Sequence, residues 1–536
     1  MAYRVLLLLL FVSTEVRAEN GDVLWSVAMG EPIFASPTLG RDGTIYLGSN
    51  ASMLTAYRAN DSEVIPLWSY TANDWIDATA ALGEDGTVYV GTYDSTLVAI
   101  DPDTGQAKWE TTLGESEGQF GVVQASPGIT SAGLIVVSTS AGFVHGVLPS
   151  GEEEWFFEIG AETRSSPAID RNDRIYFGAD DGNVYCINDN GERQWTFSVD
   201  GAGAEESRIY SSPALDEAGN VYIGSGNGSL YALTAEGQLR WRFDTPEAVD
   251  VCPAIDSDNT VYFASRNGSV YAVDQTGTEL WASFLGDIFF SSPVIDANGF
   301  LYVVYYAGSG LSKVVAFAPG GQEIWETEIE AVIDSSPVLT VDGHLLVGAF
   351  DGKLYALECG ASLGYSQPWP RFRRDTRGRG RFIETPMPEI VGSPRSQAVR
   401  GGGAASFTVE TQDNSDQAIW RRSGDVLEVG KQLTMNLSGV TLEEVSLYDV
   451  IVSNERGEVL SDHFFLSLFD FAEKTGSFIH PVNEAFNISS STDLGTWSLI
   501  DEGVSRVAGP TSGVETSSFV LDLDSSAAFV RLNLEQ

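Results

Sequence analysis

The chain has 536 residues, and 30 basic against 75 acidic side chains give it a formal net charge of -45. Nucleic acid is excluded as a main partner, because binding a phosphate backbone depends on a basic surface that releases counterions. Apolar residues make up 43% of the chain, enough for a sizeable core, and 56 glycines with 20 prolines favour an all-β chain with many turns.

Residues 1–18 have the features of a secretory signal peptide. Arg4 supplies a positive charge, an apolar run extends from Val5 to Val12, and small residues allow cleavage after Ala18. The apolar run is too short to span a bilayer, and no later stretch approaches the ~20 apolar residues of a spanning helix. The sequence predicts an exported protein without a transmembrane segment, in the periplasm, on the outer surface or secreted.

Tryptophan recurs at intervals of 40 to 46 residues and defines eight periods. Four strands of ~5 to 6 residues, with their turns, fill one such period, which is the size of a propeller blade. The tryptophans are Trp25, Trp68, Trp109, Trp155, Trp195, Trp241, Trp281, Trp325 and Trp369.

Each period repeats one pattern, most clearly in SSPALDEAGNVYIGSGNGSLYALTAEGQLRW, which ends at Trp241. It predicts strands at 211–215, 220–224, 229–233 and around Trp241, separated by turn residues. The pattern resembles the PQQ-like repeats of β-propellers, with a VYxG strand, a YALD strand, a TG turn and Trp. The best copy is TVYVGTYDSTLVAIDPDTGQAKW. The resemblance implies an eight-bladed propeller over residues 19–382.

A propeller ring is closed by a strand from one end of the repeat region. We predict that DVLWSVAM, around Trp25, forms the outer strand of the blade that starts at Ser335. The competing segment is QPWPRF, around Trp369, but Pro368 and Pro370 in it lack the N–H groups that a strand ladder needs.

After Phe382 the pattern changes, and residues 387–468 resemble an immunoglobulin-like domain. Trp420 stands at the strand C tryptophan, and Tyr448 at the position of a tyrosine corner. Apolar Val409 and Val450 occupy the two cysteine positions, so the core is predicted to form without a disulfide.

Residues 469–536 alternate apolar and polar positions between turns and predict a third, compact β module for display or attachment. Its STDLGTW segment is one residue short of a sialidase Asp box, and a turn before a strand tryptophan is the favoured interpretation.

Residue types that carry catalysis are scattered. The sequence contains no G-x-S-x-G, H-E-x-x-H or phosphate-loop motif. The histidines lie in different domains, and the cysteines are predicted to be small, buried, unpaired strand residues: His145, His344, His463 and His480, and Cys186, Cys252 and Cys359. No catalytic residue is therefore assigned.

Three turns, DRND at 170–173, DSDN at 256–259 and DANG at 296–299, resemble calcium loops faintly but offer too few ligands, so hairpin turns are favoured.

Quinone-dependent alcohol dehydrogenases are propellers of related repeats, and that resemblance implies PQQ above a calcium ion, against a disulfide of adjacent cysteines. This chain has no adjacent cysteines and nearly minimal repeats. We expect no cofactor and no metal, with a PQQ- and calcium-dependent quinoprotein dehydrogenase as the alternative.

The run RFRRDTRGRGRF at 371–382 holds six of the chain's 30 basic residues. It is either a site for an anion or a glycan carboxylate, or a structural segment whose arginines pair with acidic turns. The structural interpretation is favoured, because arginine clusters in acidic chains often form ion pairs.

The candidate binding site comes from one position compared across the repeats, the residue before each SSP-type segment. If the SSP strand is innermost, this position recurs around the channel mouth, where aromatic and charged side chains grip a ligand or fill the channel. We call these residues the mouth ring: Phe34, Asp77, Gln124, Arg164, Tyr210, Asp250, Phe290 and Asp334, extended by Trp75, Arg208 and Phe289. The sequence predicts a non-catalytic binding or scaffold protein that engages a protein or a glycan in the cell envelope or outside the cell.

Overall fold

The computed structural model describes residues 20–59, 64–113, 121–286, 291–360, 368–375, 377–381 and, with short gaps, 390–534; side chains are described up to residue 466. The predicted signal peptide and Phe290 lie outside the described residues. The described chain is all-β, as predicted, and contains one helical element, the short 3-10 helix Glu205–Ser207.

The propeller strands form eight four-stranded antiparallel sheets. The first four sheets are β2 (Thr38–Leu39), β3 (Ile45–Ser49), β4 (Met53–Ala59), β5 (Val64–Thr71); β6 (Ala81–Leu82), β7 (Val88–Gly91), β8 (Thr96–Ile100), β9 (Ala107–Thr112); β10 (Gly128–Ile129), β11 (Ile135–Thr139), β12 (Phe143–Val147), β13 (Glu153–Glu158); and β14 (Ala168–Ile169), β15 (Ile175–Gly178), β16 (Asn183–Ile187), β17 (Arg193–Ser198).

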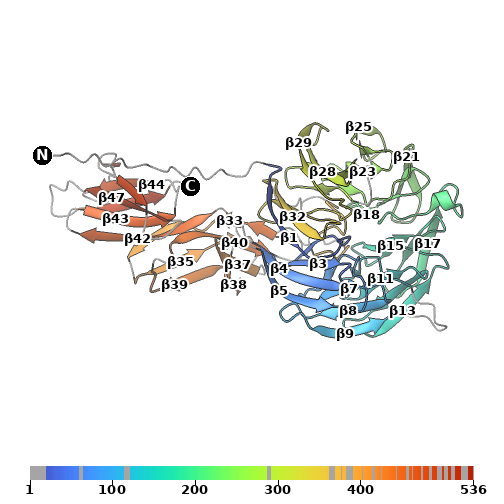
Figure 1. The fold of residues 1–536 in the computed structure, drawn as a ribbon, viewed down its shortest axis with the longest axis horizontal. Helices are drawn as coiled ribbons and strands as arrows, with labels where there is room; N and C mark the ends of the chain where they lie inside the picture. The colour runs from blue at the N-terminus through green and yellow to red at the C-terminus, as the bar shows by residue number, and fades with distance from the viewer. Residues whose placement is uncertain are drawn as a thin grey trace.

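The other four are β18 (Ala214–Leu215), β19 (Val221–Gly224), β20 (Ser229–Leu233), β21 (Leu239–Asp244); β22 (Ala254–Ile255), β23 (Val261–Ser265), β24 (Ser269–Val273), β25 (Glu279–Phe284); β26 (Val294–Ile295), β27 (Leu301–Gly308), β28 (Leu311–Phe317), β29 (Glu323–Ile329); and β30 (Val338–Leu339), β31 (His344–Gly348), β32 (Lys353–Glu358) with β1 (Val23–Ala28). Figure 1 shows these sheets arranged around a common centre, as in a β-propeller.

The strand closing the ring is the one predicted. β1 pairs antiparallel with β32, with Val27 opposite Leu354, and so becomes the outer strand of the eighth sheet. The competing segment lies elsewhere, since Trp369 is 1% exposed and forms a bridge with Ile255 of β22. Closure therefore joins two segments that lie more than 300 residues apart in the sequence.

The recurring tryptophans hold adjacent sheets together. Trp195 of β17 lies against Gly237 in a turn of the next sheet, and its indole N–H donates to Ala235 O at 3.0 Å. Gly237 has φ +80°, and a Cβ atom there would lie 2.5 Å from the Trp195 ring. The same bond recurs, at 2.7 to 3.0 Å, for Trp68, Trp109, Trp155, Trp241 and Trp281. The tryptophans therefore recur every 40 to 46 residues because each sheet repeats this contact with the next one.

The second residue of each SSP segment forms a belt of hydrogen bonds around the channel. Its backbone N–H donates to the hydroxyl of the next sheet's equivalent residue, as from Ser36 to Thr79 Oγ1 at 3.1 Å and from Ser336 to Ser36 Oγ at 2.9 Å. We call this the serine belt: Ser36, Thr79, Ser126, Ser166, Ser212, Cys252, Ser292 and Ser336. Because these backbone groups bond between sheets, each inner strand begins only after the third residue of its SSP-type segment and is shorter than predicted.

Cys252 is the single thiol of the belt, and sulfur is a weaker hydrogen-bond acceptor than the hydroxyls at the other belt positions. Cys252→Ser is expected to complete the belt and raise the free energy of unfolding by about 0.5–1.5 kcal/mol, the net value of one hydrogen bond. Urea unfolding followed by tryptophan fluorescence measures it. The control is Cys186→Ser in β16, outside the belt, and equal effects of the two substitutions would contradict the role of the belt.

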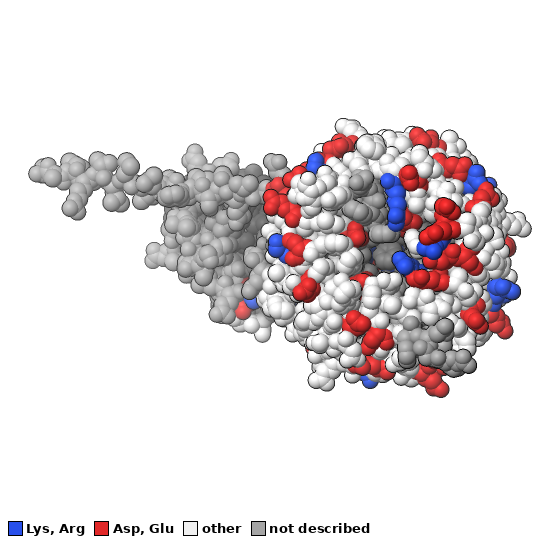
Figure 2. Space-filling model, turned by 45° about the vertical axis from the view of Figure 1, so that its right-hand side comes forward, with Lys and Arg blue, Asp and Glu red and all other residues white. Residues whose placement is uncertain are grey.

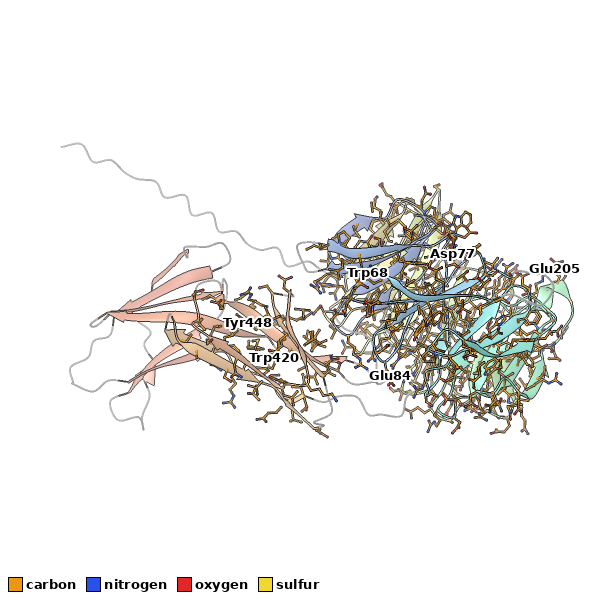
Figure 3. All side chains as sticks on the ribbon, turned by 90° about the horizontal axis from the view of Figure 1, so that it is seen from below. Trp68, Asp77, Glu84, Glu205, Trp420 and Tyr448 are labelled. Atoms are coloured by element: carbon orange, nitrogen blue, oxygen red, sulfur yellow. The ribbon has the colours of Figure 1, made fainter. Side chains whose placement is uncertain are left out.

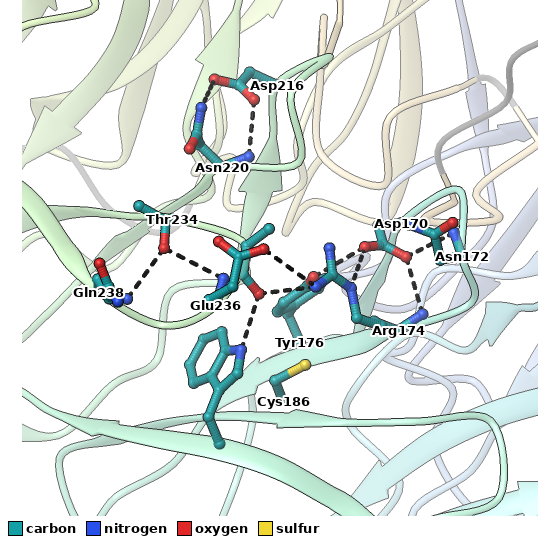
Figure 4. A network of polar contacts seen from close by, with 12 residues as sticks. Asp170, Asn172, Arg174, Tyr176, Cys186, Asp216, Asn220, Thr234, Glu236 and Gln238 are labelled. Atoms are coloured by element: carbon teal, nitrogen blue, oxygen red, sulfur yellow. Dashed lines mark hydrogen bonds and ion pairs between the residues drawn. The ribbon is translucent and has the colours of Figure 1, made fainter.

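The turns that resemble calcium loops are hairpin turns. The Asp170 carboxylate accepts the backbone N–H groups of Asn172 at 2.8 Å and Arg174 at 3.0 Å, and the Tyr176 hydroxyl at 2.9 Å (Figure 4). Asp216 accepts from Asn220 in the same way in the next sheet. These oxygens therefore bind the turn's own groups. Among the described residues, no group of three or more His, Cys, Asp or Glu side chains could hold a metal ion.

The arginine-rich run lies in the channel, at the end next to these turns. We call residues 369–375 and 377–381 the arginine plug. Its carbonyls accept N–H groups from the inner strands of five sheets, including Leu82 and Ile295. Arg373 donates from Nη1 and Nη2 to Pro167 O and Pro127 O. The structural interpretation of the run is thus supported, but Arg371, Arg373 and Arg374 donate to backbone carbonyls, where acidic turns were expected.

The strands after residue 389 form further sheets. They are β33 (Ile390–Gly392), β34 (Gln397–Arg400), β35 (Ala404–Thr408), β36 (Glu410–Thr411), β37 (Gln417–Arg422), β38 (Asp425–Gly430), β39 (Thr434–Ser438), β40 (Ser446–Ser453), β41 (Glu458–Leu460), β42 (Phe464–Ala472), β43 (Thr475–Pro481), β44 (Phe486–Ser491), β45 (Ser498–Leu499), β46 (Ser505–Ala508), β47 (Val514–Val520) and β48 (Phe529–Leu534). β42 pairs with both β40 and β43, so one sheet crosses the boundary predicted at 468/469.

Trp420 and Tyr448 lie in the core between these strands (Figure 3). The Tyr448 hydroxyl donates to Glu444 O at 2.6 Å, four residues upstream. Arg421 of β37 donates to both oxygens of Asp449, at 2.7 and 2.9 Å, and to both oxygens of Asp342 in the turn between β30 and β31, at 2.9 and 2.6 Å. This arginine links the C-terminal strands to the eighth propeller sheet.

Candidate functional site

The mouth-ring residues lie on the loops that lead into the innermost strands. The residue before each described member is buried, as Ile33 is before Phe34, which fixes the loop, while most ring side chains remain half-buried. Arg164 is exposed and Asp250 is buried, at 7% exposure. Figure 2 shows a hollow at the centre of one face of the propeller, with acidic and basic side chains on its rim.

A second set of loop residues joins the mouth ring. They stand at or near the end of the second strand of each sheet, two positions after the VYxG glycine or the residue that replaces it. We call them the loop ring: Asn50, Tyr93, Ser140, Asp180, Gly226, Arg266, Tyr306 and Phe350. Backbone bonds fix them beside the mouth-ring loops, as from Tyr93 N–H to Trp75 O at 3.0 Å and from Phe350 N–H to Val332 O at 2.8 Å.

Aromatic side chains of the two rings pair in the eighth, first and second sheets. The rings of Phe34 and Phe350 lie 4.4 Å apart between centroids, and those of Trp75 and Tyr93 lie 5.5 Å apart. Gln124 donates to the Tyr93 hydroxyl, which also bonds Asp77. Trp75 is 46% exposed, so this part of the mouth presents aromatic surface to solvent.

Arginines lie in the fourth, fifth and sixth sheets. The Arg164 guanidinium lies over the Tyr210 ring, 5.1 Å from its centroid, and Arg208 donates to the Tyr210 hydroxyl at 3.3 Å. Arg266 Nε lies 2.5 Å from an Asp250 oxygen. This part of the mouth therefore neutralises much of its own charge.

Buried acceptor oxygens without a hydrogen-bond partner occur in both parts of the mouth. In the arginine-bearing part they belong to Asp180 and Asp250, which face Arg208 and Arg266. In the aromatic part they are Asn50 Oδ1, Asp77 Oδ1 and Asp334 Oδ1. Burial raises the pKa of Asp334 to about 6. Burial also raises the pKa of Asp77, against the lowering effect of the Tyr93 hydrogen bond. We call this part, formed by the eighth, first and second sheets, the acidic–aromatic half.

The loop ring was missed at the level of sequence, although the signal that found the mouth ring is present there too. Residues two positions after the VYxG glycine differ from repeat to repeat, whereas Gly, Tyr and Trp recur. Phe289 and Phe290 lie outside the described residues, so their contribution to the site stays a prediction.

The residues of the mouth do not fit PQQ in the arrangement that the quinoprotein resemblance implies. The three cysteines are buried and lie far apart in the sequence, Cys186 in β16, Cys252 before β22 and Cys359 after β32, and burial raises the pKa of the Cys186 and Cys252 thiols to about 12. His145, also buried, lies with Nδ1 2.9 Å from Glu153 Oε1 on neighbouring strands β12 and β13. The prediction that the cysteines are buried is confirmed for all three, whereas the predicted strand position is found for Cys186 alone.

The sheets and their repeated contacts define a β-propeller of PQQ-like repeats. Residues 12–189 and 180–308 match the protein family described as outer membrane protein assembly factor BamB, which together is more than half of the 536 residues. The chain belongs to this family, as the repeat resemblance predicted.

Solved structures similar to the chain show the same fold. BamB from Moraxella catarrhalis has a TM-score of 0.53 and 20% identity, covering 63% of this chain and 97% of that chain. The computationally designed Ika8 protein has 0.52 and 15%, covering 63% and 100%. Quinohemoprotein alcohol dehydrogenase from Comamonas testosteroni has 0.51 and 13%, covering 70% and 79%. At these identities the likeness shows the fold alone.

A search of the curated proteins finds no match. No helix in the described part of the chain is both long enough and apolar enough to cross a membrane.

Proposed function

We propose that this protein is an exported, non-catalytic scaffold that engages a protein partner through the mouth of an eight-bladed propeller, each four-stranded sheet being one blade. The observation that carries the proposal is the contrast within each repeat. Residues that build the sheets recur and are buried, whereas the mouth ring and loop ring differ between repeats and are mostly half-buried. A fold does not require such variety at equivalent positions, but a surface that recognises one partner does.

Two further features support a protein partner. The arginine plug occupies the turn end of the channel, so the mouth ring lies at the end opposite to the plug. The family to which the chain belongs is described as an assembly factor, which is a protein-binding role. A glycan is the second ligand class, since exposed aromatic faces such as Trp75 also stack on sugar rings.

For the rest of the chain we propose a signal peptide at 1–18, the propeller at 19–382, an immunoglobulin-like domain at 387–468 and a terminal β module at 469–536. The buried Trp420 and the Tyr448 hydroxyl bond to Glu444 O support the immunoglobulin-like domain. Export, to the periplasm, the outer surface or the medium, rests on the signal features of the sequence.

The proposal is tested by capture from an envelope extract. Phe34→Ala with Tyr210→Ala is expected to lose at least 90% of the captured partner, because aromatic anchors at the centre of an interface carry most of its binding energy. The matched control is Phe156→Ala with Phe284→Ala, two phenylalanines exposed on outer strands. Mass spectrometry quantifies the partner.

Equal capture by both double variants would contradict binding at the mouth. The enzymatic alternative is tested separately, by titrating PQQ and calcium and following dye-linked alcohol oxidation. Saturable binding with turnover would overturn the non-catalytic assignment.

A further inference from the structure

The charge of the acidic–aromatic half has one sign. Its loops are residues 29–34, 50–52, 72–77, 92–95, 330–334 and 349–352, and they contain no lysine or arginine. Their seven acidic residues are Glu31, Asp74, Asp77, Asp94, Glu330, Asp334 and Asp351. The adjoining Lys353 is held by Asp351, with Nζ 2.8 Å from Oδ2. A cationic group therefore meets a negative potential here, whereas the arginine-bearing part of the mouth repels it in part.

The serine belt brings the polar groups of this half together. Asp334 stands two residues before Ser336, and Phe34 two residues before Ser36. Since the Ser336 backbone N–H donates to the Ser36 side-chain Oγ at 2.9 Å, the two ring positions lie on adjacent, hydrogen-bonded segments. Asp77 is connected in the same way through Thr79, the acceptor of Ser36 N–H. The three sheets therefore present their ring residues side by side.

The groups that converge there require a donor. Buried Asn50 Oδ1, Asp77 Oδ1 and Asp334 Oδ1 have no hydrogen-bond partner, and leaving such acceptors unpaired is unfavourable. Phe34 lies on the first sheet, between the two carboxylate-bearing sheets, with its ring against Phe350 of the eighth sheet, and aromatic faces attract cations. Carbonyl-type acceptors, carboxylates and aromatic faces together match a nitrogen cation with several N–H groups.

We propose that the acidic–aromatic half receives one cationic side chain, a lysine ammonium or an arginine guanidinium, from a segment of the protein partner. The inference rests on the proposed function, because it names the chemistry that the partner brings to the mouth. Hydrogen bonds to Asn50, Asp77 and Asp334 orient the cation, and the aromatic rings cover its apolar stem. The arginines of the other half then meet acidic or neutral groups of the same partner.

The experiment uses small probes on the full chain. Binding of N-acetyl-lysine amide, N-acetyl-arginine amide and uncharged N-acetyl-norleucine amide is followed by ligand-observed NMR. We expect at least one of the two cationic amides to bind at least tenfold more tightly than the norleucine amide. Asp77→Asn with Asp334→Asn is expected to remove this preference. The control is Glu84→Gln, an exposed carboxylate in a turn between inner strands, far from Asp77 in Figure 3.

Norleucine amide binding as tightly as both cationic amides, or an unchanged preference in the Asn double variant, would overturn the inference. Melting temperatures establish that each variant is folded. Capture of the partner separates the two proposals. If Phe34→Ala with Tyr210→Ala loses the partner while Asp77→Asn with Asp334→Asn keeps it, the mouth binds the partner without a cation. If both keep it, the proposed function itself fails.

Discussion

Asp375→Asn is expected to lower the free energy of unfolding of the propeller by about 3–5 kcal/mol, the effect of removing one partner from a buried ion pair. Asp375 is 2% exposed and accepts from Arg379 Nε and Nη2 at 2.9 and 2.7 Å. Asp375 is the one buried carboxylate among the described plug residues. Five arginines of the plug are at most 3% exposed: Arg371, Arg373, Arg374, Arg377 and Arg379. Removing its charge takes away the buried carboxylate that interacts with Arg379, Arg377 and Arg374.

The pH dependence follows from the same contacts. Burial acts to raise the pKa of Asp375, but Arg379, Arg377 and Arg374 outweigh it and hold the pKa below its usual range. Its contribution is therefore present above the pKa of the unfolded chain and is lost as the pH falls further. Urea unfolding of the wild type and of Asp375→Asn at pH 7 measures the effect. Asp258→Asn, an exposed turn carboxylate at the same end of the propeller, is the control. A loss below 1 kcal/mol would contradict the ion-pair role.

Asp334→Asn is expected to have the opposite effect and to stabilise the protein by up to about 3 kcal/mol above pH 6. Burial raises the pKa of Asp334 from 3.8 to about 6. The folded protein therefore binds a proton that the unfolded chain has already released, so stability falls as the pH rises from about 4 to about 6. Asparagine has no charge to desolvate and does not incur this cost.

The measurement is the difference in unfolding free energy between Asp334→Asn and the wild type at pH 4 and at pH 7.5. Other carboxylates titrate equally in both proteins, so their effects cancel in the difference. The stabilisation should be close to zero at pH 4 and largest at pH 7.5. A variant less stable than the wild type at pH 7.5 would show that the Asp334 carboxylate has a partner in the folded protein.

The propeller was predictable because its determinants are periodic. Six of the recurring indoles, from Trp68 to Trp281, meet the equivalent turn glycine of the next sheet, so the contact between Trp195 and Gly237 is repeated in the sequence. The closing strand was predictable from local chemistry, because Pro368 and Pro370 could not donate to a ladder.

Contacts without a repeat were not predictable. Arg373 binds Pro127 O and Pro167 O, more than 200 residues away, and every residue has such a carbonyl. The acidic turns that were expected to pair with the plug are occupied by their own backbone, as Asp170 shows. In the site, the sequence predicted the position of each mouth-ring residue, but not the side chain that it contacts. Phe350 lies against Phe34 because closure of the ring places the eighth sheet beside the first, although the two are far apart in the sequence.

Ring closure also sets the order in which the chain can mature. β1 is synthesised first, but β32, to which it binds, comes some 330 residues later. At ~5–20 residues per second, roughly 20–70 s pass before the two strands can meet. During this interval β1 has no ladder partner, and the unfinished ring exposes a strand edge that can pair with other chains. The arginine plug follows β32 in the chain, so the channel is filled only once the ring can close. The protein should therefore depend on factors that hold incomplete chains apart. A circular permutant that begins at the first sheet and places β1 directly after β32 should depend less on such factors.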